Sequence, residues 1–201
     1  AEKFKMHLTS DEVNVIEILP GGVVTKKAAA HIQLDENGEF VRNPKEDLVK
    51  VAVVERHQGT GNVACGFLKG YGIKEGAVAL SVAHDSHNII VVGVNDEEME
   101  FAVNSLIAQE GGIVLVKEGK VIEQMPMPIA GLMSDQSGEW VDEKLTSIHE
   151  KAYTELGICG DVEPVMTLCF MSLAVIPEIK LTDMGLFDVT TFSFIPVEIS
   201  R

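Results

Sequence analysis

Short apolar segments of strand length, separated by glycine-rich turns, constrain the fold of this chain more than any other feature. Leu48–Val54 (LVKVAVV) and Ala77–Ala83 are rich in valine and alanine, and Asn88–Val94 (NIIVVGV) is apolar almost throughout. Six glycines lie between positions 59 and 76, with no helical segment after them, so they suit tight turns between short strands rather than a phosphate-binding loop. The chain is therefore expected to consist mainly of strands.

Two segments carry helical signals instead. Asn95 and Asp96 begin the first, Gly111 and Gly112 end it, and four residues form its predicted apolar stripe: Phe101, Val103, Leu106 and Ile107. The second spans about residues 139–156 and turns four residues inward: Trp140, Leu145, Ile148 and Ala152. Between them, Lys117–Lys120 is typical of a hairpin turn.

Strands outnumber helices in this pattern, and few strand–helix–strand units are visible. We therefore predict an α+β fold with a mixed, largely antiparallel sheet and about two main helices. Val13–Leu19 and Val23–Leu34 are further predicted strands, and Leu186–Ile199 has strand character interrupted by Pro196. The organisation expected is one domain over residues 1–201, with residues 1–44 as a possible small β-rich subdomain.

Charge and hydropathy exclude several classes of partner. The chain has 31 acidic and 16 basic residues and a formal net charge of −15, which disfavours nucleic acids and acidic membrane surfaces. No apolar run approaches the roughly 20 residues of a membrane span, and no signal peptide is visible. The three cysteines, without CxxC spacing, are expected in the core of a cytoplasmic protein: Cys65, Cys159 and Cys169. An apolar content of 46% indicates either a large core or a surface that a partner covers.

Polar side chains gather in two segments beside the apolar strands. Glu55, Arg56 and His57 directly follow one strand and precede a glycine turn, and His84–Asn88 (HDSHN) lies between two apolar segments. Polar side chains next to a core are costly unless they have partners. We therefore expect these segments to meet a ligand, another domain or local turn groups.

The histidine segment admits three interpretations. His84, Asp85, His87 and Asn88 could line a site or an interface, could satisfy a local turn, or could ligate a metal. A strand would point His84 and His87 to opposite faces, whereas a turn would let them converge. Arg56 could bind a carboxylate across a domain boundary or stack on a purine, or it could pair with Glu55 or another acid at the surface.

Four peptides resemble, in order, the signature segments of the C-terminal domain of bacterial and archaeal adenine deaminases. They are VERHQGTGN, GFLKGYGIKEGAVALSVAHDSHNIIVVGVND, MPIAGLMSD and VIPEIKLTDMGLFDV, and they extend from about residue 50 to residue 190. The resemblance implies an amidohydrolase that converts adenine to hypoxanthine and ammonia in adenine salvage. Its divalent metals (manganese, iron or zinc) are held by a (β/α)₈ barrel that carries an HxH motif.

This sequence contains no HxH motif, and 201 residues are too few for that barrel together with this domain. Hydrolytic deamination needs a metal-activated water and a general acid, so the isolated chain is expected to be inactive. No metal ligand and no catalytic residue is therefore assigned within it.

The first functional hypothesis is a C-terminal domain that completes or covers the adenine site of its own N-terminal barrel. The predicted site-lining residues are His84, Asp85, His87, Asn88, Arg56, His57 and Glu55. The alternative is a structural or oligomerisation module, and a homo-oligomer is expected in either case. A third hypothesis is an independent small-molecule binder that uses the glycine-rich segment.

Overall fold

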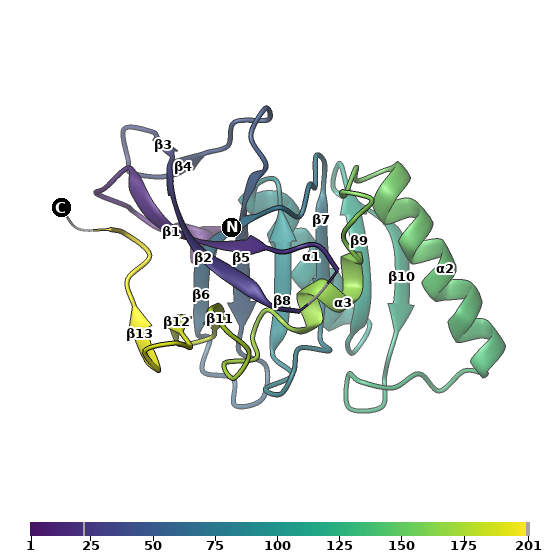
Figure 1. Cartoon of the computed structure of the whole chain (residues 1–201). Coiled ribbons are helices and arrows are strands. Elements are labelled where there is room, and N and C mark those ends of the chain that lie inside the picture. Colours follow the sequence, from purple (N-terminus) through teal and green to yellow (C-terminus); the bar gives the residue numbers. More distant parts are fainter. Residues whose placement is uncertain (22, 200–201) are drawn as a thin grey trace.

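An open eight-stranded sheet forms the centre of the computed structural model, which describes residues 1–21 and 23–199 (Figure 1). Its strand order is β10-β9-β7-β8-β5-β6-β1-β2. The strands are β1 (Glu12–Ile18), β2 (Thr25–His31), β5 (Leu48–Val54), β6 (Val63–Lys69), β7 (Ala77–Leu80), β8 (Ile89–Gly93), β9 (Gly112–Lys117) and β10 (Lys120–Pro126). Among the described residues β1 and β6 pair in parallel, and the other neighbours pair antiparallel.

Smaller elements surround this sheet. A three-stranded sheet has the order β11-β12-β13, and β3 pairs with β4. The remaining elements are η1 (Glu2–Phe4), β3 (Gln33–Leu34), β4 (Phe40–Val41), α1 (Asp96–Ala108), α2 (Gly138–Thr154), α3 (Pro164–Cys169), β11 (Ile179–Thr182), β12 (Gly185–Asp188) and β13 (Ser193–Ile195). The predicted α+β fold with a largely antiparallel sheet and two main helices is confirmed. No helix in the described part of the chain is both long and apolar enough to cross a bilayer.

Both faces of the large sheet are covered, which explains why β5 and β8 are buried along almost their whole length. On one face, Val49, Val51 and Val53 join a core completed by α2, α3 and the three-stranded sheet. On the other face, alanines of β5 and β7 pack against α1. A Cβ atom on Gly93 would lie 2.6 Å from Cγ of Met99, so this glycine lets α1 approach the sheet closely.

The predicted apolar stripe of α1 is partly wrong. Val103 and Leu106 are buried, but Phe101 is 36% exposed and Ile107 is 56% exposed. Met99 and Ala102 take their places, which gives the spacing i, i+3, i+4, i+7 expected for a helix on a flat sheet. Met99 fits against the sheet because Gly93 has no side chain at that point.

The three cysteines also differ from prediction. Cys169 is buried and Cys65 is half-buried, and burial raises the pKa of each thiol to about 12. Cys159 is exposed instead, so its assignment to the core is wrong. It lies in the loop after α2, where its backbone N–H donates to the carbonyl of Tyr71 at 3.1 Å and its side chain is left outside the core.

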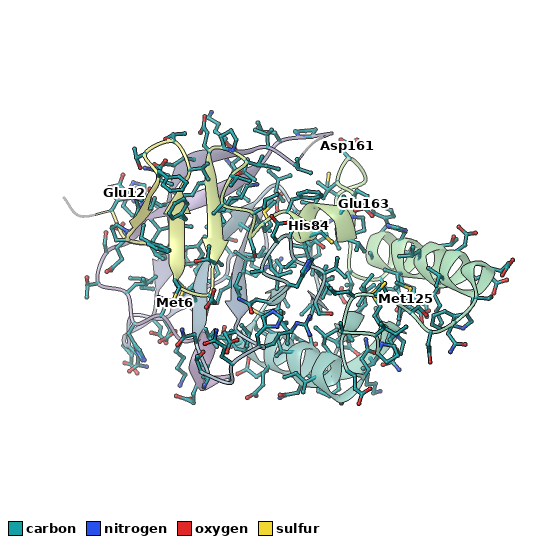
Figure 2. The ribbon with its side chains drawn as sticks, turned by 90° about the horizontal axis from the view of Figure 1, so that it is seen from below. Met6, Glu12, His84, Met125, Asp161 and Glu163 are labelled. Atoms are coloured by element: carbon teal, nitrogen blue, oxygen red, sulfur yellow. The ribbon has the colours of Figure 1, made fainter. Side chains whose placement is uncertain are left out.

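One end of the large sheet collects the loops that carry the polar segments. β5 and β7 end there, and β8 and β9 begin there, as their antiparallel pairing requires. The loops at this end, at the bottom of Figure 1, include the glycine-rich turn after β5, the histidine segment and the connection from β10 to α2. Figure 2 looks onto this end, with His84 labelled near the middle of the face beside α3.

Candidate functional site

The histidine segment is a turn between β7 and β8, and the turn brings the two imidazoles together. The backbone N–H of His87 donates to the carbonyl of Ala83 at 2.6 Å, and His87 has a left-handed φ of 52°. The ring centroids of His84 and His87 lie 5.7 Å apart, edge to face. His84 also packs on Phe170, with a centroid distance of 4.7 Å. Of the two geometries considered from sequence, the convergent turn is therefore the one that forms.

Arg56 fixes this turn to a neighbouring loop. Its Nε donates to the carbonyl of His87 at 2.5 Å, and its Nη2 donates to the carbonyl of Ala130 at 2.9 Å. A Cβ on Gly131 would lie 2.7 Å from Nη1, so the guanidinium lies directly against the loop backbone. Of the alternatives considered for Arg56, the surface ion pair with Glu55 or another acid does not form, because no acidic side chain of the described residues lies within 4.0 Å of this group. Carbonyl oxygens hold Arg56 and leave its charge unneutralised.

Glu55 is committed to its own loop. Its carboxylate accepts from the backbone N–H groups of His57, Gln58 and Thr60, and from the Thr60 hydroxyl, at 2.5 to 3.0 Å. These hydrogen bonds lower the pKa of Glu55 to about 2. Glu55 therefore organises the turn after β5, while the adjacent His57 reaches across it, with Nε2 2.7 Å from the carbonyl of Ser86.

The last two predicted site residues lie at opposite extremes of exposure. The side chain of Asp85 is 87% exposed, with its carboxylate 3.9 Å from Nδ1 of His84. Asn88 is buried, and its side-chain oxygen accepts from the backbone N–H of Arg56 at 3.3 Å. Asn88 is thus a structural link between the two polar segments, whereas Asp85 is free to meet a ligand or a partner.

A shallow hollow of about 630 Å³ lies where these segments meet the loop after β10. Its lining joins three predicted residues to five others: Arg56, His57, His87, Glu110, Pro128, Ala130, Gly131 and Leu132. An apolar groove of about 320 Å³ also contains Arg56 and Glu110 and continues along α1. The sequence interpretation missed Glu110 and the 128–132 loop, although the family-like peptide MPIAGLMSD pointed to that loop.

His87 is the most unusual group at this hollow. Burial lowers the pKa of His87, and electrostatic interactions with the His84 ring and the Arg56 guanidinium lower it further. Its Nδ1 atom is inaccessible to solvent and has no hydrogen-bond partner among the described residues. Burial therefore favours the neutral ring, and because Nδ1 is enclosed, a polar ligand can hydrogen-bond only the other ring nitrogen, Nε2.

The donor atoms present here do not suit a metal ion. Within residues 1–21 and 23–199, no three His, Cys, Asp or Glu side chains are grouped as metal ligands. His57 already engages a carbonyl, and Asp85 is directed to solvent. What the hollow offers is a cation, two imidazole rings, the Glu110 carboxylate and backbone carbonyls, a set that can hydrogen-bond the edge of a polar ring or pair with another protein surface.

The comparisons with known proteins agree on one relationship. A family model described as the adenine deaminase C-terminal domain matches residues 22–193. The chain is 68% identical over 197 residues to adenine deaminase 2 of Desulfotalea psychrophila, a match that covers 98% of this chain and 34% of that protein. It is 49% identical over 198 residues to adenine deaminase of Ligilactobacillus salivarius and 46% identical over 199 residues to that of Halalkalibacterium halodurans, again with 98% and 34% coverage. The chain therefore spans about a third of the length of these relatives.

Proposed function

The chain belongs to the adenine deaminase family and corresponds to its C-terminal domain, and on that premise we propose that it completes the active site of a longer enzyme that hydrolyses adenine to hypoxanthine and ammonia. The observation that carries the proposal is the convergence of His84, His87, Arg56 and His57 at one loop-bearing end of the sheet. This convergence lies within the residues that the family model matches.

In this proposal the histidine turn faces the adenine site, which the rest of the enzyme provides. A divalent metal there, expected to be manganese, iron or zinc, supplies the activated water when bound. This chain supplies the cover: the turn and the 128–132 loop exclude bulk water, and the neutral His87 ring hydrogen-bonds a polar edge of the purine. Asp85, the most exposed member of the turn, contacts either the purine or the rim of the metal-bearing domain.

Exposed apolar side chains beside the hollow support a covering role. Ile129 is 47% exposed and Met133 is 57% exposed, and both lie in the same connection between β10 and α2. Ile107 borders the adjoining groove and is also exposed. Exposed apolar side chains gathered in this way are typical of a surface that another domain covers.

Replacement of the histidines in the full-length enzyme tests the proposal. His84→Ala and His87→Ala are expected to lower kcat/KM for ammonia release from adenine at least about tenfold, with the melting temperature nearly unchanged. His31→Ala is the matched control. His31 is an exposed histidine at the end of β2, where it pairs with Asp11, the residue before β1.

The competing function, a structural or oligomerisation module, predicts the reverse. Under it, the histidine variants would lower stability more than turnover, and that result would refute the covering role. The isolated 201-residue chain is predicted to release no ammonia from adenine, even with added manganese, iron or zinc. A cytoplasmic location and a homo-oligomeric state also remain predictions.

A further inference from the structure

The three-stranded sheet exposes an aromatic surface that the candidate site does not use. Phe192 is 74% exposed, Phe194 is 56% exposed and Met184 is 67% exposed. Both exposed rings meet the buried Phe187 edge to face, at centroid distances of 5.3 Å and 5.2 Å. A ring carbon of Phe194 lies 3.8 Å from the Cβ position of Gly185, the neighbour of Met184, so Phe194 lies beside the turn that exposes Met184. We call Phe192, Phe194 and Met184 together the Phe192–Phe194 surface.

The turn that carries this surface is held by several hydrogen bonds and an ion pair. Asp188 is buried, and its carboxylate accepts from the backbone N–H groups of Thr190 and Thr191 at 2.9 and 3.1 Å. The other oxygen of Asp188 pairs with Lys27 of β2 at 2.9 Å. Phe192 follows at a left-handed φ of 53°, a conformation that bulky residues rarely adopt. The fold thus holds a large apolar ring in solvent, in a fixed position, as a preformed anchor for binding would require.

The Phe192–Phe194 surface continues into the end of the sheet that bears the histidine turn. Nδ2 of Asn62 lies 3.7 Å from the sulfur of Met184, and Asn62 belongs to the loop that Glu55 and His57 organise. Figure 2 shows the three-stranded sheet, in yellow, on the same face as the labelled His84. A domain placed over the histidine turn would therefore also reach the aromatic surface.

We propose that the Phe192–Phe194 surface docks the metal-bearing domain of the same enzyme and so fixes the histidine turn over the adenine site. This inference rests on the proposed function. The relatives are about three times as long as this chain, so they contain the additional polypeptide that the surface needs. Aromatic side chains beside polar residues are typical anchors of protein interfaces, and here Asn62 contacts Met184, while Asp183 and Thr191 are the chain neighbours of Met184 and Phe192.

The test compares Phe192→Ser/Phe194→Ser with Phe101→Ser in the full-length enzyme. Phe101 is a matched control because it is a partly exposed aromatic residue on α1, which packs on the opposite face of the large sheet. Calorimetry and limited proteolysis report domain coupling, light scattering reports the oligomeric state, and ammonia release reports turnover. The double variant of the 201-residue chain, followed by circular dichroism, shows whether the domain itself still folds.

We expect the double variant to split one unfolding transition into two, to speed interdomain cleavage at least tenfold and to lower kcat/KM, with the oligomeric state unchanged. Unchanged coupling would overturn the inference, and so would a change from oligomer to monomer with coupling intact, which would assign the surface to a second copy of the chain. If the double variant does not fold, Met184→Ser together with Phe192→Ser is measured against the same outcomes. If His87→Ala loses turnover while Phe192→Ser/Phe194→Ser leaves domain coupling unchanged, the docking surface alone is refuted. If Phe192→Ser/Phe194→Ser uncouples the domains while His87→Ala keeps its turnover, the covering role alone is refuted.

Discussion

Lys180, in β11, is wholly buried and offers a direct measure of the cost of an unpaired charge in this core. Its ammonium donates to the carbonyl of Val23 at 2.8 Å and has no carboxylate within 4.0 Å among the described residues. Burial lowers the pKa of Lys180 from its ordinary 10.5 to about 8. That difference corresponds to about 3 kcal/mol of destabilisation while the group is charged in both states, at about 1.36 kcal/mol per pKa unit.

Replacement by methionine is therefore expected to stabilise the protein. Lys180→Met removes the charge but leaves the Val23 carbonyl without its donor, which costs about 1 kcal/mol. The expected net gain is about 2 kcal/mol in the free energy of unfolding at pH 7. Because the folded-state pKa is lower than the unfolded one, the unfolded state binds more protons between pH 8 and 10.5. The wild-type protein should therefore gain stability relative to the variant across that range.

Urea unfolding followed by circular dichroism, at pH 7 and again near pH 10, measures both effects on the 201-residue chain. The difference between the two proteins cancels the titration of other groups. Lys50→Met is the matched control: Lys50 is also buried, but it pairs with Asp96 at 2.7 Å, so its removal should destabilise the protein. A Lys180→Met variant less stable than wild type at pH 7, or a difference that does not change with pH, would refute the reasoning.

Three further predictions concern the packing of the domain, and one of them concerns a loop of the candidate site. Gly76→Ala should destabilise by about 2–4 kcal/mol in chemical denaturation, because the new Cβ would lie 1.9 Å from the carbonyl of Val116 at a φ of +67°. Ser81→Ala should cost about 1–3 kcal/mol in the same assay and loosen the 128–132 loop in hydrogen exchange, since the buried hydroxyl bonds the Gly131 carbonyl at 2.5 Å. Glu123→Gln should lower the melting temperature at pH 7 but have little effect near pH 2. Lys144, Ser147 and Lys151 lower the pKa of Glu123 to about 2 despite its partial burial, so the wild type loses this stabilisation as the pH falls from about 4.5 to 2. Unchanged melting at pH 7 would contradict that account.

Local sequence signals correctly predicted the elements that depend mainly on residues close together in the chain. β5 begins and ends at the predicted residues, because Leu48–Val54 is a valine-rich segment between polar residues. Asn95 caps α1 as predicted, with its side chain accepting from the N–H of Glu98. The turn Asp183–Met184, between β11 and β12, also follows a local signal, since Thr182 hydrogen-bonds the chain across it.

The predicted end of one strand is wrong because a side chain replaces the backbone hydrogen bonds there. The strand predicted to reach Ala83 stops at Leu80. From there the Ser81 hydroxyl accepts from the N–H of Gly112, a contact between residues 31 positions apart. No local pattern contains that information.

The candidate site shows the same division. The sequence by itself determined that polar segments at residues 55–57 and 84–88 lie beside apolar strands, and the ordered peptides identified the family. Only the tertiary structure decided that Arg56 binds carbonyl groups rather than acids, that Glu110 and the 128–132 loop share the hollow, and that an aromatic surface lies on the same face. The physical reason is that strand pairing and the choice of face bring together residues far apart in the chain, and these depend on packing among elements that no single segment encodes.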